Sequence, residues 1–280
     1  MGLIAETLGA IAGGYALLLG GLTVFQRDMI YHPGHQLPSP EEAGVPEMLA
    51  VPVRTTDNLV VSGWYAPPSR SGAETIVYCH GNARTLAHRA HTARRLLDAG
   101  YGVFLVGYRG YGGNPGRPSE DGLYTDTRAT LGWLLGRGTP PERLVLYGES
   151  LGTGVAAQMA TEQPDIAALI LEAPFTRLAD LAPPYLLPGL APALLLDQYD
   201  TLSKIADIRQ PMLVLHGEMD GVVPVAMGRK LVEAARDRAH GHFIPGGGHN
   251  NLWDMGAGDT VLAFLQNRQT EAISEEDEES

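Results

Sequence analysis

The sequence predicts an α/β fold with a mostly parallel, doubly wound sheet, helices on both faces and a short cap. Two observations lead to this prediction. Six short runs are almost continuously hydrophobic, as expected of strands buried on both faces; they begin at Thr75, Tyr101, Arg143, Ile166, Pro211 and His240. The stretches between these runs have helical spacing, as in residues 83–100, where apolar side chains share one face. Such alternation favours parallel strands joined by right-handed crossovers.

The composition is that of a folded, acidic protein. The chain has 280 residues, of which 44% are hydrophobic and 19% are charged, and this is enough apolar material for a large core. The net charge of −12 argues against a nucleic-acid-binding protein. Cys79 is the single cysteine, so no internal disulfide can form, and we interpret this residue as part of a buried strand.

Residues 269–280 are predicted to form an acidic, disordered tail. Six of the last ten residues are acidic, so half of the net charge lies in this tail. A block of like charges is usually solvated and disordered. Binding of a partner is the alternative role for it.

Residues 1–30 are predicted to form an apolar helix that anchors the chain in a membrane as a single pass. From Thr7 to Gln26 there is no charged residue, and a helix of this length spans the hydrocarbon core of a bilayer. A cleaved signal peptide fits less well, because no Lys or Arg precedes the apolar run and Phe25-Gln26-Arg27 is a poor cleavage site. A buried helix is the other alternative, since five glycines dilute the hydrophobicity. The side of the membrane that would hold the body stays open.

The rest of the chain is interpreted as a polar, proline-rich connector, residues 31–50, and one main domain, residues 51–268. The domain begins with two β-rich runs split by Thr56-Asp57-Asn58, which predicts a hairpin. Residues 176–210 are strongly apolar and predict a short cap. The cap either forms an apolar ligand pocket or is apolar only because it must bury its own face.

The segment from Gly148 to Gly152 has the pattern G-x-S-x-G, with Ser150 at its centre. It directly follows one predicted strand and directly precedes a predicted helix, and this setting presents a serine as a nucleophile. The serine lies on a sharp turn with strained backbone angles, so its neighbours must lack bulk. We therefore predict that Ser150 is a nucleophile. The alternative is an ordinary serine N-cap in a tight turn.

A serine nucleophile needs a base. Of the nine histidines, His249 is the one that follows the last predicted strand and is preceded by three glycines. A carboxylate should then orient the imidazole. Asp220, just after the strand at 211–217, is the first candidate, and Glu172, at the end of the preceding strand, is the alternative. No histidine pair has metal-ligand spacing beside a third ligand, so we expect no metal and no other cofactor.

An oxyanion formed at this serine requires backbone donors. The N–H of Leu151 follows the nucleophile at the start of a predicted helix, where N–H groups are free and the helix dipole is positive. We expect the second donor to be the N–H of Asn82, in the loop after the strand at 75–79. Gly81 precedes it and lets the backbone approach the substrate.

Together these motifs resemble the α/β-hydrolase superfamily, and most of all its small membrane-anchored abhydrolase-domain serine hydrolases, which are related to the depalmitoylases. The resemblance runs from Phe25 to Asn250 and is carried by Phe25-Gln26-Arg27 with Tyr31, His80 to Ala83, Tyr108 to Gly112, Gly148 to Gly152, Leu171 to Phe175, Leu213 to Asp220, and Gly248 to Asn250. It implies the α/β-hydrolase fold with a triad in the chain order Ser150, Asp220, His249. It also implies an oxyanion hole on Asn82 and Leu151.

The function expected from these features is hydrolysis of carboxylic esters or thioesters through an acyl-enzyme on Ser150. The predicted membrane anchor and apolar cap favour a small lipophilic acyl substrate. A serine peptidase with the same triad is one alternative. A non-catalytic scaffold of the same fold is the other.

Overall fold

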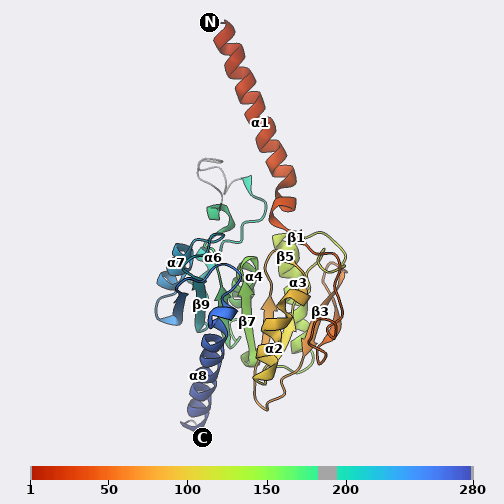
Figure 1. Cartoon of the computed structure of the whole chain (residues 1–280), viewed down its shortest axis with the longest axis vertical. Helices are drawn as coiled ribbons and strands as arrows, with labels where there is room; N and C mark the ends of the chain where they lie inside the picture. The colour runs from red at the N-terminus through yellow and green to blue at the C-terminus, as the bar shows by residue number, and fades with distance from the viewer. Residues whose placement is uncertain (1, 182–193, 279–280) are drawn as a thin grey trace.

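A computed structural model describes residues 2–181 and 194–278 of the chain (Figure 1). Within these residues the main sheet has eight strands in the order β10-β9-β8-β7-β4-β6-β3-β2. Their bounds are β2 (Leu49–Arg54), β3 (Val60–Ala66), β4 (Thr75–Cys79), β6 (Gly102–Leu105), β7 (Leu144–Glu149), β8 (Ala168–Glu172), β9 (Met212–Gly217) and β10 (Ala239–Ile244). The strands from β4 onward are parallel, whereas β2 and β3 form the predicted antiparallel hairpin at one edge.

Helices cover both faces of this sheet (Figure 1). The α-helices of the described ranges are α1 (Gly2–Ile30), α2 (Ala90–Asp98), α3 (Glu120–Leu135), α4 (Leu151–Glu162), α6 (Thr201–Lys204), α7 (Val225–Ala235) and α8 (Ala257–Glu278). Short 3-10 helices lie at Leu86–Arg89, Pro141–Arg143, Leu178–Leu181, Arg236–Arg238 and Trp253–Met255. A separate two-stranded ladder pairs β1 (His32–Pro33) with β5 (Ala83–Arg84).

Side chains along each central strand alternate between two cores. In β4, Val77 and Cys79 join the core that contains α3, α4 and α7, while Ile76 and Tyr78 join the core that contains α2 and α8. All five residues of β4 are buried, and the same is true of β8. This burial on both faces explains the continuous hydrophobic runs in the sequence. The α/β-hydrolase fold class is confirmed, and Cys79 is a buried strand residue as predicted.

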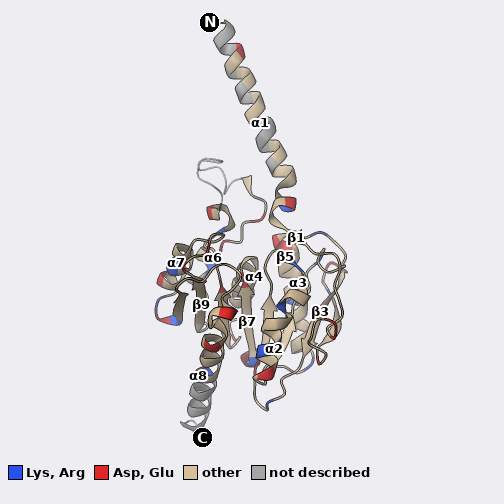
Figure 2. Ribbon diagram, in the orientation of Figure 1, with Lys and Arg blue, Asp and Glu red and all other residues tan. Residues whose placement is uncertain are grey.

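The membrane prediction for the N-terminal segment is wrong. The segment does form a long helix, α1, which projects from the body and has its charged residues toward its two ends (Figures 1 and 2). Yet in the part of the chain that the structure describes, no helix is long and apolar enough to cross a bilayer. Five glycines between Thr7 and Gln26 dilute the apolar surface of this helix, because a glycine adds almost no apolar side-chain area. The expected single-pass membrane localisation is therefore contradicted.

Two other predicted segments are the acidic tail, which is helical as far as Glu278, and the cap, which the structure describes only in part. Helix α8 continues to Glu278 through most of the predicted disordered tail, since Gln, Glu and Ala have good helix propensity. The predicted cap, residues 176–210, is described only at its two ends, because residues 182–193 lie outside the described residues. Its first end contains the 3-10 helix Leu178–Leu181, and its second end leads into α6.

A buried ion pair fixes the loop that follows β6. The Asp126 carboxylate is fully buried and accepts hydrogen bonds from the backbone N–H of Arg109 at 2.8 Å and from its guanidinium group at 2.8 Å. The same guanidinium reaches Asp57 in the β2–β3 turn at 2.7 Å. The pair therefore ties the hairpin edge, this loop and α3 together.

We expect Asp126→Ala to lower the free energy of unfolding by about 3 kcal/mol, because it leaves the buried Arg109 cation without its main partner. Urea denaturation monitored by circular dichroism measures the change. Asp165→Ala, at an exposed aspartate, is the matched control and should cost less than about 0.5 kcal/mol. A loss at Asp126 no larger than the control would show that the pair adds nothing to stability.

Candidate active site

The carboxyl ends of the parallel strands meet at one edge of the sheet, and the predicted site residues gather there. Ser150 directly follows β7, Asp220 lies three residues after β9, and His249 lies five residues after β10. Ligand sites in open α/β sheets lie at this edge. Residues up to 99 positions apart thus become neighbours through the sheet order alone.

Ser150 occupies the strained turn that the sequence predicts. Its φ is +50° and its ψ is −117°, in a region that residues other than glycine rarely adopt. The turn is possible because its flanks lack side chains. A Cβ on Gly152 would lie 1.9 Å from the carbonyl oxygen of Cys79, and one on Gly148 would lie 2.5 Å from Cα of Thr153. The Ser150 N–H donates to the carbonyl of Glu172 at 2.8 Å, which holds the turn against β8.

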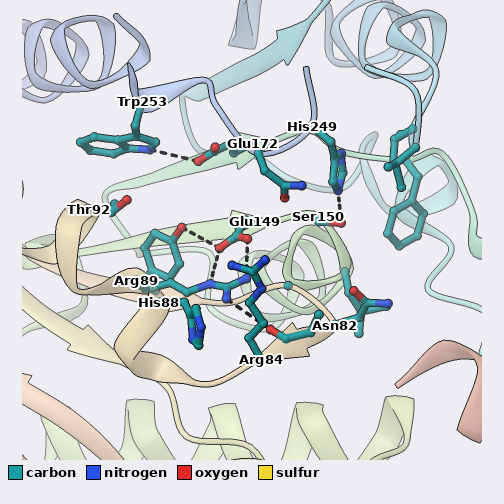
Figure 3. Close-up of a pocket in the computed structure, with 18 of the residues that line it drawn as sticks. Asn82, Arg84, His88, Arg89, Thr92, Glu149, Ser150, Glu172, His249 and Trp253 are labelled. Atoms are coloured by element: carbon teal, nitrogen blue, oxygen red, sulfur yellow. Dashed lines mark hydrogen bonds and ion pairs between the residues drawn. The ribbon is translucent and has the colours of Figure 1, made fainter. Parts of the chain in front are cut away.

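The structure brings Ser150, His249 and Asp220 into one hydrogen-bonded chain (Figure 3 shows the first two). Nε2 of His249 lies 3.0 Å from Oγ of Ser150, and Nδ1 lies 2.7 Å from the Asp220 carboxylate. An ionised carboxylate only accepts hydrogen bonds, so Nδ1 carries the imidazole proton and Nε2 is the acceptor for the serine hydroxyl. This arrangement suits removal of the Ser150 proton by His249.

Asp220 is held ionised by its surroundings. Burial alone would raise the pKa of this carboxyl, but hydrogen bonding from His216 and His249 and from the N–H groups of Val223 and Val222 keeps the pKa well below its usual range. The two N–H groups each donate to Oδ1 at 2.8 Å. A carboxylate fixed in this way can orient the imidazole and stabilise the cation that forms on it.

His216 is a partner of Asp220 that the sequence reading missed. Its Nε2 lies 2.9 Å from the carbonyl of Val223 and 3.4 Å from the Asp220 carboxylate, and its ring is fully buried. In the sequence it stands only as a histidine at the end of the predicted strand at 211–217. The spacing His216-Gly217-Glu218-Met219-Asp220 was the available signal, because a strand end followed by a tight turn brings these two side chains together.

Glu172, the alternative to Asp220, lies in a different network on the pocket wall (Figure 3). Its carboxyl group accepts hydrogen bonds from the hydroxyl of Tyr147 and from Nε1 of Trp253 at 3.1 Å. Burial raises the pKa of Glu172 to about 7, and the nearby charge of Glu149 adds to the increase. Glu172 therefore titrates near neutral pH.

Glu149, the neighbour of Ser150 in the chain, pairs with Arg89 across the same wall (Figure 3). Nε of Arg89 donates to the Glu149 carboxylate at 2.8 Å, and the hydroxyl of Tyr78 donates to the same oxygen at 2.9 Å. Burial alone would raise the pKa of Glu149, but Arg89 outweighs it and the pKa is lowered. No local sequence pattern indicates this pair, whose partners are 60 residues apart.

The two predicted oxyanion donors lie beside the serine. Leu151 is the first residue of α4, and Asn82 follows Gly81, where an added Cβ would lie 3.4 Å from Cβ of Ser150. Within residues 2–181 and 194–278, neither the N–H of Leu151 nor that of Asn82 has a hydrogen-bond acceptor. Both remain available to a ligand oxygen.

A cavity of about 600 Å³ opens at Ser150, and its lining includes both apolar and polar side chains. The apolar lining residues include Met29, Ile30, Phe175, Leu178, Leu181 and Val222. The polar lining residues include Arg84, His88, Arg89, His91, Thr92, Glu149, Glu172 and Asp254, together with Trp253. Across the described residues, no group of three or more His, Cys, Asp or Glu side chains is arranged to hold a metal ion.

Comparison with known proteins places the chain in a family. Residues 71–195 match the family model described as serine aminopeptidase, S33. Uncharacterized protein Rv2307c of Mycobacterium tuberculosis is 41% identical over 84% of this chain and 86% of its own length. The α/β hydrolase domain-containing protein WAV2 of Arabidopsis thaliana is 31% identical over 96% of this chain and 95% of its own. An esterase of Pyrococcus furiosus shares the fold, with a TM-score of 0.68 at 20% identity over 85% of this chain and 97% of that one.

The fold and the relatives define the class of protein: the chain belongs to the α/β-hydrolase superfamily. It is a hydrolase of that superfamily, and the predicted resemblance is confirmed at this level. The membrane-anchored character that accompanied the resemblance is not supported.

The raised pKa of Glu172 predicts a pH-dependent stability. Because the folded state holds this proton more tightly than the unfolded state does, stability should fall as pH rises from about 4.5 to about 7. Glu172→Gln has no titrating carboxyl at this position. Between pH 4.5 and pH 7, the unfolding free energy of wild type should therefore fall by about 3 kcal/mol more than that of Glu172→Gln. Urea denaturation at pH 4.5 and pH 7.5 measures the difference.

Glu233→Gln, at an exposed glutamate of α7, is the control for this experiment and should follow wild type at both pH values. If Glu172→Gln also followed wild type, Glu172 would not be the group that titrates in the folded protein.

Proposed function

We propose that this chain is a serine hydrolase that cleaves carboxylic esters or thioesters through an acyl-enzyme on Ser150. The observation that carries the proposal is the continuous contact from Ser150 Oγ to His249 at 3.0 Å and from His249 to Asp220 at 2.7 Å. Nucleophile, base and orienting carboxylate are the groups that acyl transfer requires. The strained turn at Ser150 supports the same role.

The proposed reaction has two steps. His249 Nε2 takes the Ser150 proton as Oγ attacks the carbonyl carbon, and the oxyanion accepts hydrogen bonds from the N–H groups of Asn82 and Leu151. The tetrahedral intermediate collapses, and the alcohol or thiol leaves with the proton from His249. Water then attacks the acyl-enzyme, giving its proton to His249, and the acid is released as Ser150 regains a proton.

The apolar side chains of the cavity lining support a lipophilic acyl group as part of the substrate. Phe175, Leu178 and Leu181 are among them, and the latter two also pack against the core that contains α3, α4 and α7. An acyl chain placed among them would leave water, which stabilises the complex in proportion to the apolar area buried. The polar lining residues would then be available to the leaving group.

We expect Ser150→Ala to abolish labelling by a fluorophosphonate probe and to lower kcat for an ester by at least about 10⁴-fold, because no other nucleophile is in place. Labelling is read by intact-protein mass spectrometry. Ser203→Ala, at an exposed serine of α6, is the control and should be labelled as wild type is. Equal labelling of Ser150→Ala and wild type would remove Ser150 from the mechanism.

The substrate proposal predicts a preference for longer acyl chains. Each methylene buried among the apolar lining side chains should raise kcat/KM by up to about fourfold, until the cavity is filled. Leu181→Gln should weaken this dependence, as measured on p-nitrophenyl esters from acetate to decanoate, with Leu49→Gln at an exposed position as control. An unchanged chain-length profile in Leu181→Gln, or faster cleavage of peptide substrates by wild type, would contradict a lipophilic ester as substrate.

A further inference from the structure

The N-terminal strap, defined as residues 30–34, lies against the loop that carries Asn82. Its strand β1 runs parallel to β5, with His32 opposite Ala83 and Pro33 opposite Arg84. Two backbone hydrogen bonds join the strap to the loop, from His32 N–H to the Asn82 carbonyl at 2.9 Å and from Gly34 N–H to the Arg84 carbonyl at 3.0 Å. The loop beside the serine is therefore half of a ladder whose other half is the N-terminal segment.

Asn82 is the residue that the strap holds most firmly. Its side-chain Nδ2 donates to the carbonyl of Ile30 at 2.7 Å. Its carbonyl accepts from His32 N–H and also from the hydroxyl of Tyr111 at 2.7 Å. These three hydrogen bonds fix the side chain and the following peptide plane, while the N–H of Asn82 has no acceptor in the described chain.

The strap is in turn fixed to the body through a buried carboxylate. Tyr31 is 3% exposed, and its hydroxyl lies 3.0 Å from Asp197 and 2.9 Å from the hydroxyl of Tyr199. Arg27, in the last turn of α1, contacts both oxygens of Asp197 at 3.0 and 3.1 Å. Asp197 also accepts from the N–H of Glu120 at the start of α3. The end of α1 is thus tied to the described end of the cap and to the main domain.

The same segment reaches the cavity. Met29 and Ile30 line it, and so does Arg84, which pairs with the strap. Arg84 has a φ of +73°, an unfavourable conformation for this residue that the ladder holds in place. Strap, oxyanion loop and pocket wall are therefore one connected unit.

We propose that the N-terminal strap positions the oxyanion hole, with Asn82 as the positioning residue whose side-chain amide, through the Ile30 carbonyl, keeps its own backbone N–H directed at the substrate oxygen. The proposal rests on the hydrolase function proposed above. A hydrogen-bond donor that is in place before the reaction needs no reorganisation when negative charge develops on the substrate oxygen. This preorganisation is the source of the rate enhancement that such donors provide. The strap thereby gives the C-terminal end of α1 a part in the site.

The test compares full-length wild type with Asn82→Leu, which has a similar shape, keeps the backbone N–H and loses the side-chain donor. Loss of a whole oxyanion donor costs about 10²- to 10³-fold in kcat, so a loosened donor should cost about tenfold or more. KM should change less than about twofold, because the contact acts in the transition state. Tyr31→Phe, which removes one hydroxyl and creates no cavity, should lower kcat in the same direction by a smaller factor.

Gln210→Leu is the matched control. Gln210 is also a buried amide that donates to backbone carbonyls, those of Ala160 and Gln163, and it lies outside the pocket. Its replacement should lower stability and leave kcat unchanged. If Asn82→Leu kept wild-type kcat while folded, or if Gln210→Leu lost kcat to the same degree, the positioning role would be overturned.

Hydrogen exchange tests the role of the strap independently of the proposed hydrolase function. The His32 amide should exchange about fivefold faster or more in Asn82→Leu than in wild type, because the ladder loosens when the Asn82 contact is lost. This readout does not require activity. A wild type that neither hydrolyses esters nor reacts with the fluorophosphonate would refute the function alone, whereas unchanged exchange in Asn82→Leu would refute the strap.

Discussion

The strained turn at Ser150 is the constraint on which the rest of the site depends. A positive φ at a serine is unfavourable, and here the turn is possible because Gly148 and Gly152 carry no side chain that would clash with Thr153 and Cys79. The Ser150 N–H contact with the Glu172 carbonyl joins the turn to the neighbouring strand. The turn therefore sets at once where the hydroxyl lies, where α4 begins and where the N–H of Leu151 is available.

Two groups of residues surround the turn: a cluster of charged side chains and the loop that carries Asn82. On one side, Arg89 keeps Glu149 ionised, while burial and the charge of Glu149 raise the pKa of Glu172 on the adjacent strand. On the other side, the N-terminal strap holds Asn82 through two hydrogen bonds, and the hydroxyl of Tyr111 adds a third. Both groups use partners far away in the chain, and the cavity between them is lined by polar and apolar side chains. A substrate with an apolar acyl group and a polar leaving group fits that lining.

Much of the fold follows from the sequence because its signals are local. Hydrophobic runs located the parallel strands, and the G-x-S-x-G turn located Ser150, since strand, turn and helix are contiguous. Contacts made by long side chains across the fold have no local pattern, so the Arg89–Glu149 pair and the clamp of Tyr31 on Asp197 were missed. The membrane prediction failed for another reason. The absence of charge from residue 7 to residue 26 suggests a membrane span, but five glycines lower the apolar content of this stretch.

The most direct test of the proposed chemistry is a crystal structure of the protein after reaction with a fluorophosphonate. The phosphorus should be bonded to Ser150 Oγ, with the phosphoryl oxygen about 3 Å from the backbone nitrogens of both Asn82 and Leu151. Asn82 should keep its contact with the Ile30 carbonyl in that adduct. An adduct on another residue, or a phosphoryl oxygen turned away from these two N–H groups, would contradict the proposed mechanism.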